Sequence, residues 1–217
     1  MRGRTKNLIY IIFCLVMIVL MIVPAVHHHR EQRLAADKVT SSKITPKKSH
    51  HKEAVSNHMR TPIDWRKSSE TVPYPDLSKV KRLWVKVVIP KNRVYLYDGN
   101  KVIYTMYCSA GVYKTDPKTG KKKSATPTGT FHVQEERGDH FFNSQVKVGA
   151  NYYVSWHDHG QYLFHSVPTD ANGHYIKEEA AKLGKFTGSH GCVRLSVADA
   201  KWMEHNLPTG TKVVIQD

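Results

Sequence analysis

The sequence predicts a mainly β domain over residues 81–217, built as a β-sandwich or strongly curved sheet with two short helices. Short runs of alternating apolar residues recur from Leu83 to the C-terminus, and this period of two is typical of half-buried strands. Turn sequences such as Asp98-Gly99 separate the runs. Only two segments have a helical pattern, and many short strands with few helices indicate the mainly β class.

The predicted elements follow one another with short connections. Strands or hairpins are expected at residues 83–89, 92–111, 125–133, 151–166 and 211–216. The two helices are expected at 176–184, which ends on a glycine, and at 196–207, whose first residue Ser196 can cap the helix N-terminus.

The N-terminus has a different character. Residues 7–26 carry no charge over about the length that spans a bilayer, and the basic residues Arg2, Arg4 and Lys6 precede them. We therefore expect residues 1–6 in the cytoplasm, a transmembrane signal anchor at 7–26, and the rest of the chain on the cell-wall side of the membrane. A cleaved signal peptide is the alternative, but the apolar run is long and "IVPAVHHH" is a poor cleavage site.

Residues 27–80 are expected to be an extracytoplasmic linker. They are rich in His, Lys, Ser, Thr and Pro, and such a composition buries too little apolar surface to offset the entropy of ordering. Within the linker, the aromatic and proline residues of 61–75 could pack onto the edge of the domain.

Charge narrows the range of partners. Lys and Arg outnumber Asp and Glu by 33 to 18, a net charge of +15, which suits anionic cell-wall polymers or anionic lipid. No zinc-finger spacing or aromatic RNA-binding motif is present, so we expect no nucleic-acid partner. The lysine-rich stretch 118–124 could hold phosphate groups of a wall polymer, although a solvated loop is the commoner meaning of such a run.

The stretch "GSHGCVRL" contains the most reactive combination of residues in the chain. A thiol nucleophile needs a base and donors for the developing oxyanion. His165 or His190 could act as the base for Cys192, and the amides of Gly191 and Cys192 could be the donors. A buried structural cysteine remains an equal alternative on these grounds. No second cysteine lies at metal-binding spacing, so we expect no metal and no cofactor.

Three motifs together resemble one protein family. "SHGCVRL", the upstream "LFHS" and "TPTGTF" are similar to the L,D-transpeptidase catalytic domain (YkuD) family of bacterial cell-wall enzymes, over about residues 83–216. The resemblance implies a β-sandwich-like domain that attacks the third residue of a peptidoglycan tetrapeptide stem and releases D-Ala. It then transfers the acyl group to an acceptor amine, which forms a 3→3 cross-link.

The resemblance also implies roles for single residues. The positions that match the family's site are the nucleophile Cys192, the base His165, the orienting residue Ser166, and the further motif residues Ser189, His190 and Gly191. Whether the hydroxyl or the carbonyl of Ser166 orients the base stays open. Arg194 could bind a substrate carboxylate or brace the loop through backbone carbonyls.

Further residues could border the substrate, and three other functions remain as alternatives. Tyr153 could help Arg194 and Ser189 to bind substrate. Residues 167–188, between the two histidine motifs, are longer than is common in the family and are expected to cap the cleft. An L,D-carboxypeptidase that uses water, a non-catalytic wall-binding module and a zinc-dependent hydrolase are the alternative functions.

Overall fold

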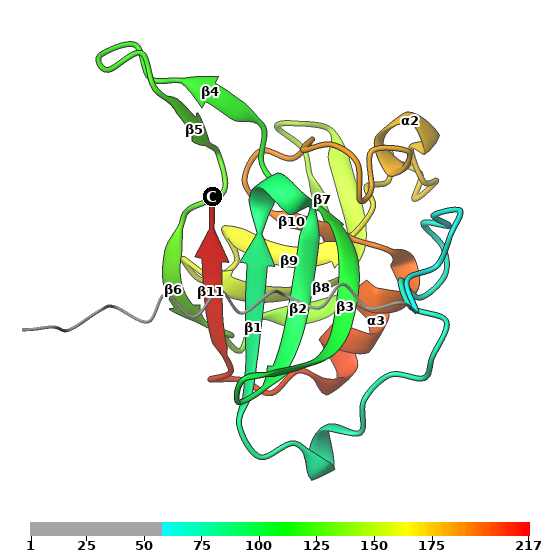
Figure 1. Cartoon of the computed structure of the whole chain (residues 1–217). Helices are drawn as coiled ribbons and strands as arrows, with labels where there is room; N and C mark the ends of the chain where they lie inside the picture. Colours follow the sequence, from blue (N-terminus) through cyan, green and yellow to red (C-terminus); the bar gives the residue numbers. More distant parts are fainter. Residues whose placement is uncertain (1–57) are drawn as a thin grey trace, which may run out of the picture. The chain divides into compact units, whose positions relative to one another are not determined.

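A strongly bent nine-stranded sheet organises residues 58–217, the part of the chain that the computed structural model describes (Figure 1). Its order is β6-β11-β1-β2-β3-β10-β9-β8-β7. The strands are β1 (Leu83–Val88), β2 (Arg93–Asp98), β3 (Lys101–Ser109), β6 (Gly129–His132), β7 (Arg137–Asn143), β8 (Val148–His157), β9 (Tyr162–Ser166), β10 (Val193–Leu195) and β11 (Lys212–Gln216). β4 (Tyr113–Thr115) and β5 (Lys122–Ser124) form a separate two-stranded sheet.

Helices are few and short. They are α2 (Lys177–Ala180) and α3 (Val197–Asn206), with the 3-10 turns η1 (Leu77–Lys79) and η2 (Ile89–Lys91). Ser196 caps α3, because its side chain accepts a hydrogen bond from the Asp199 amide at 3.0 Å. The predicted mainly β class with two helices is confirmed. The first helix is shorter than expected, since only residues 177–180 are helical and the chain then turns to Gly184.

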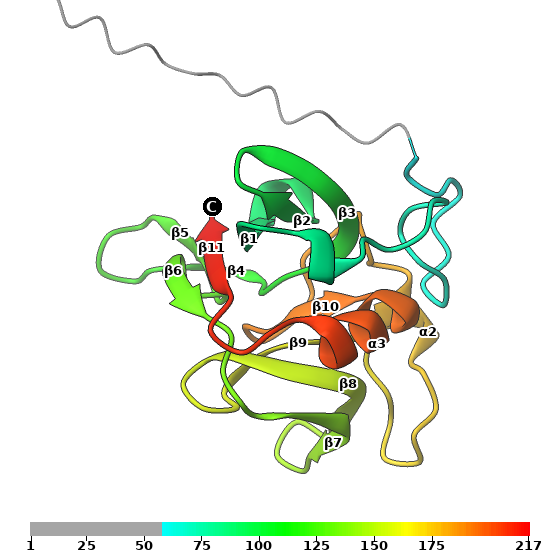
Figure 2. The same cartoon turned by 90° about the horizontal axis from the view of Figure 1, so that it is seen from below.

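The bend of the sheet encloses the hydrophobic core. Figure 2 shows β1–β3 on one side of the molecule and β8–β10 on the other, and side chains from both halves are buried together between them. Helix α3 packs against β8 and β9. Fully buried members of this core include Val87, Leu96, Met106, Phe164, Val193, Met203 and Ile215. Stacked apolar faces of this kind are what the period-two pattern predicts.

Residues 58–80, expected as the end of the linker, lie against the domain as a strap. Ser69 accepts a hydrogen bond from the Tyr107 amide at 2.7 Å and donates one to Asp199 at 2.5 Å, and a Glu70 carboxylate oxygen accepts one from the Thr105 amide at 2.9 Å. These contacts satisfy amides of β3 that no strand pairs. The linker expectation is thus corrected for residues 58–80, whereas the packing expected of 61–75 is present. The anchor at 7–26 and the linker up to residue 57 lie outside the described residues.

Among residues 58–217, no helix is long and apolar enough to cross a membrane.

Candidate active site

Parallel pairing of β9 with β10 brings the predicted catalytic residues onto one face of the sheet. Val193 is opposite Phe164, and Arg194 is opposite His165. Val193 and Phe164 are fully buried in the core. Because successive side chains of a strand point to opposite faces, His165 and Arg194 face away from that core, and Cys192 lies on the same side just before β10.

The loop before β10 presents Cys192. Gly191 has a φ of 149°, and a Cβ atom there would lie 2.7 Å from the ring of Tyr162, so the loop needs glycine at this position. The Cys192 thiol is partly exposed and donates to the carbonyl of Gln161 at 3.8 Å. Burial raises the pKa of this thiol, against an opposing contribution from the Leu163 backbone and the Arg194 charge. The resting thiol is therefore protonated near neutral pH.

His165 is held as a neutral base. Its Nδ1 lies 2.7 Å from the Ser166 carbonyl oxygen, and since a carbonyl only accepts, Nδ1 must carry the proton. The unprotonated Nε2 is then free to take a proton. Burial first, and the nearby Arg194 charge second, lower the pKa of His165 to about 3. The ring of Phe141 packs edge-on against the imidazole with centroids 5.4 Å apart.

The structure separates the two possible roles of Ser166. Its hydroxyl donates to the Val167 carbonyl at 2.8 Å and accepts from the Asn151 amide at 3.0 Å. The contact with Asn151 ties β9 to the neighbouring strand β8, and the contact with Val167 is local, to the next residue in the chain. The backbone carbonyl of Ser166, and not its hydroxyl, therefore orients His165.

Ser189 braces the nucleophile loop from within. Its hydroxyl donates to the Cys192 carbonyl at 2.5 Å and accepts from the Gly191 amide at 3.0 Å. The Gly191 amide, expected as an oxyanion donor, is therefore engaged, which leaves the Cys192 amide as the candidate donor. Both contacts of the Ser189 hydroxyl lie inside the loop, and its role in substrate binding stays a prediction. His190 is exposed and makes no side-chain hydrogen bond within residues 58–217.

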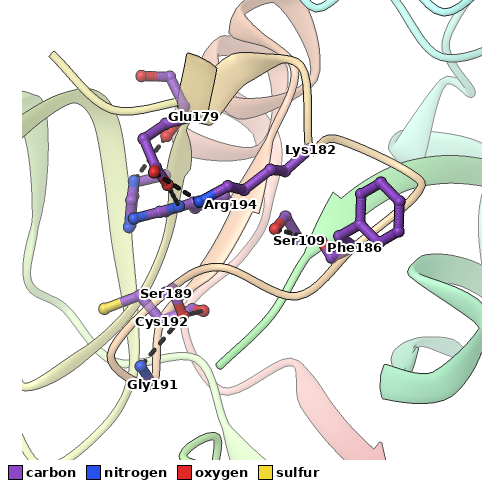
Figure 3. A network of polar contacts seen from close by, with 10 residues as sticks. Ser109, Glu179, Lys182, Phe186, Ser189, Gly191, Cys192 and Arg194 are labelled. Carbon is purple, nitrogen blue, oxygen red and sulfur yellow. Dashed lines mark hydrogen bonds and ion pairs between the residues drawn. The ribbon is translucent and has the colours of Figure 1, made fainter. Parts of the chain in front are cut away.

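Arg194 of β10 takes part in an ion-pair cluster with Glu179 of α2 and with Lys182, which follows this helix. A guanidinium nitrogen of Arg194 lies 2.6 Å from one Glu179 oxygen, and the Lys182 ammonium lies 2.6 Å from the other (Figure 3). Burial raises the pKa of Glu179, but the two cations outweigh it and lower the pKa overall. The ion pair fixes α2 to the active-site strand, a contact that neither predicted role of Arg194 included. Binding of a substrate carboxylate by Arg194 stays a prediction. Sequence reasoning missed Glu179 and Lys182, and the acidic "KEEA" segment was the available signal.

Tyr153 is separated from the base His165 by the ring of Phe141. Its ring packs edge-on against Phe141 at 5.6 Å, and Phe141 in turn contacts His165. Tyr153 is only partly buried. It can therefore border a substrate near the imidazole, while its contact with the histidine is indirect.

The second thiol among the described residues, that of Cys108, is unsuited to catalysis. Cys108 is fully buried in the core, and burial raises its pKa to about 12. Both Cys108 and Cys192 are free thiols. Within the described part of the chain, no group of three or more His, Cys, Asp or Glu side chains could hold a metal ion.

Comparison with known proteins places the chain in a family. The Bacillus subtilis (strain 168) protein named "Putative L,D-transpeptidase YciB" is 47% identical over 156 residues, covering 72% of this chain and 76% of the relative. Among solved structures, an L,D-transpeptidase from Mycobacterium smegmatis matches with 19% identity and a TM-score of 0.47, and covers 63% of this chain. LdtMt1 in complex with imipenem matches with 20% identity, a TM-score of 0.46 and 62% coverage.

The chain spans 59% of the length of each of these two solved proteins. The family model of the YkuD L,D-transpeptidase catalytic domain matches residues 82–215. That range contains the bent sheet, the Cys192 loop and His165. The chain therefore belongs to the YkuD family of L,D-transpeptidase catalytic domains.

Proposed function

We propose that this protein is a peptidoglycan L,D-transpeptidase whose nucleophile is Cys192. The observation that carries the proposal is the state of His165: the imidazole is neutral, its Nδ1 proton is fixed on the Ser166 carbonyl, and it shares a sheet face with the thiol. A neutral, oriented base on the same sheet face as a protonated thiol is what general-base activation of a nucleophile requires.

The first half-reaction is acylation. His165 Nε2 takes the proton of the Cys192 thiol as the sulfur attacks the carbonyl carbon of the third stem residue. The Cys192 amide donates to the oxyanion. The bond to the D-Ala nitrogen then breaks, and the protonated His165 gives its proton to this leaving amine. The products are free D-Ala and a thioester on Cys192.

The second half-reaction transfers the acyl group. An acceptor amine attacks the thioester while His165 takes a proton from the amine nitrogen. The carbon–sulfur bond breaks, the thiolate regains the proton, and a 3→3 cross-link is released. Water as the acceptor would give an L,D-carboxypeptidase, with a tripeptide stem as product.

The pKa directions define how the proton moves. Burial raises the pKa of Cys192, and burial together with Arg194 lowers that of His165. Both shifts disfavour a resting thiolate–imidazolium pair. The resting pair is therefore a neutral thiol and a neutral imidazole, and in the proposed mechanism proton transfer accompanies attack.

We further propose that the catalytic domain lies on the wall side of the membrane, tethered through the anchor at 7–26 and the following linker. The uncharged segment and the basic residues before it support this placement. Peptidoglycan stem peptides are the proposed substrate and anionic wall polymers the proposed further partner. The net charge of +15 supports the latter.

The proposal is tested with purified full-length protein in detergent and a disaccharide-tetrapeptide substrate. We expect release of D-Ala and formation of 3→3 dimers, measured by mass spectrometry of the muropeptides. Cys192→Ala should abolish both products, whereas the matched variant Cys108→Ala should keep them. Stems that bind the protein but stay intact would indicate a non-catalytic wall-binding module. Loss of activity with a chelator would indicate a zinc-dependent hydrolase.

A further inference from the structure

Residues 112–124 form an arm that projects from the main sheet (Figure 1). Its two strands β4 and β5 pair only with each other. Most of its side chains are exposed, and the buried Ser124 lies at its base. A two-stranded ribbon without a packed face is marginally stable by itself. Packing within the ribbon therefore does not account for the form of the arm.

The arm is strongly basic. All five of its lysines are exposed, and none forms an ion pair with another described residue. Its only acidic residue, Asp116, accepts hydrogen bonds from the turn amides of Lys118 and Thr119 at 2.8 and 3.0 Å. The lysines are Lys114, Lys118, Lys121, Lys122 and Lys123.

Two of these lysines face each other across the ribbon. Lys114 of β4 is directly opposite Lys123 of β5, and like charges in directly opposite positions destabilise a strand pair. A bound anion between the two ammonium groups would convert this repulsion into attraction. The register therefore points to a negatively charged ligand.

The base of the arm is joined to the nucleophile loop. The Thr126 hydroxyl donates to the Gly191 carbonyl at 2.8 Å and accepts from the Gly111 amide at 2.7 Å. The Val112 amide donates to the Ser189 carbonyl at 2.9 Å. A ligand on the arm is thus held next to the loop that carries Cys192.

We propose that the arm binds a linear wall polymer with phosphodiester groups and so positions the active site against the wall. This inference rests on the proposed location of the domain at the cell wall. Lysine is a compact point charge that suits phosphate, and the arm has no arginine for bidentate contact with carboxylates. Tyr113 is its only exposed large apolar side chain, and its hydroxyl bonds to Asp217. The arm therefore lacks the apolar anchor that a membrane-binding hairpin would insert.

The test measures binding of labelled poly(glycerol phosphate) to full-length protein that carries Cys192→Ala, which removes turnover from the measurement. The arm variant is Lys114→Gln/Lys123→Gln. The control, Lys81→Gln/Lys101→Gln, removes the same charge from exposed positions at the far end of β3 and β1. We expect roughly tenfold weaker binding for the arm variant and less than twofold change for the control. Binding should weaken with salt, less steeply in the arm variant.

Thermal unfolding of the same variants shows whether a loss of binding comes from a folding defect. Because the like-charge contact is removed, the arm variant should unfold at the same or a higher temperature than its parent. Equal losses of binding in both variants would overturn the proposal, as would tighter binding to phosphatidylglycerol vesicles than to the polymer. Failure to release D-Ala from isolated stems would refute only the proposed enzymatic function, because polymer binding is measured in a protein without the nucleophile.

Discussion

The pH dependence of acylation tests the proposed state of His165 directly. With a pKa of about 3, about 99% of the imidazole is uncharged at pH 5, so base availability barely changes between pH 7 and 5. An ordinary histidine with a pKa of about 6.5 would be about three-quarters uncharged at pH 7 and about 3% uncharged at pH 5. The structure thus predicts less than a twofold change in the acylation rate from this cause, against about 25-fold for an unperturbed base.

Stopped-flow acylation of Cys192 by a carbapenem, followed from pH 5 to 9.5, provides the measurement. His165→Ala is the matched variant: its rate should fall by about 10²–10⁴-fold near neutral pH and recover in part as the pH approaches the thiol pKa. A wild-type profile with an acid limb centred near pH 6.5 and a 25-fold amplitude would show that His165 has an ordinary pKa.

The same pKa has a consequence for stability. The folded-state pKa of His165 lies below its unfolded value of about 6.5, so the unfolded chain binds more protons in acid. The contribution of His165 to the free energy of unfolding is fully present above pH 6.5 and is lost as the pH falls toward 3. At pH 5 it amounts to a loss of about 2 kcal/mol in the free energy of unfolding. His165→Gln should remove this loss in urea unfolding at pH 7.5 and 5.

Asp199 gives the free energy of unfolding a pH dependence of the opposite sign. Its pKa is raised to about 6, chiefly by burial and despite the hydrogen bonds it accepts. Its contribution to stability is fully present below pH 4 and is lost as the pH rises through 6. Because Asp199 is unchanged in both proteins, it cancels in the comparison. An identical pH dependence in wild type and His165→Gln would contradict the assigned pKa.

Three further predictions concern single residues. Glu179→Ala leaves a buried guanidinium unpaired and should lower the free energy of unfolding by about 3 kcal/mol, whereas the same change at its exposed neighbour Glu178 should cost less than about 0.5 kcal/mol; equal costs would exclude the ion pair as the cause. His190→Ala should slow acylation without recovery at pH 9, in contrast to the His165 variant, and alkaline rescue of the His190 variant alone would reverse their roles. Cys108→Ala should lower stability by about 2 kcal/mol through the cavity it leaves while acylation continues, and an inactive variant would contradict the choice of nucleophile.

Local sequence patterns were sufficient for much of the sheet. Alternating apolar residues and the Asp98-Gly99 turn predicted β1–β3, and similar patterns predicted β8, β9 and β11. β7 was missed because it is an edge strand whose side chains are half-buried or exposed, so its sequence carries no clean alternation. β10 has only three residues, too few for a period to be visible.

The contacts of the site were harder to predict because they depend on three-dimensional placement. The motifs identified Cys192 and His165, but the register of β9 with its neighbours decides that the Ser166 hydroxyl is already occupied. Glu179 reaches Arg194 only because residues 167–188, between the two histidine motifs, fold back over the sheet. The composition of residues 58–80 predicts a linker because their polar side chains gain partners only in the folded domain, as Glu70 does from β3 and Ser69 from Asp199 of α3.

Trapping the covalent intermediate is the decisive test of Cys192 as the nucleophile. Wild-type protein is incubated with a disaccharide-tetrapeptide in the absence of an acceptor amine, quenched in acid and mapped by peptide mass spectrometry. We expect an acyl adduct of the stem lacking D-Ala, linked as a thioester to the peptide that contains Cys192. An adduct on Cys108, or D-Ala release without any adduct on Cys192 even at the shortest quench times, would contradict it.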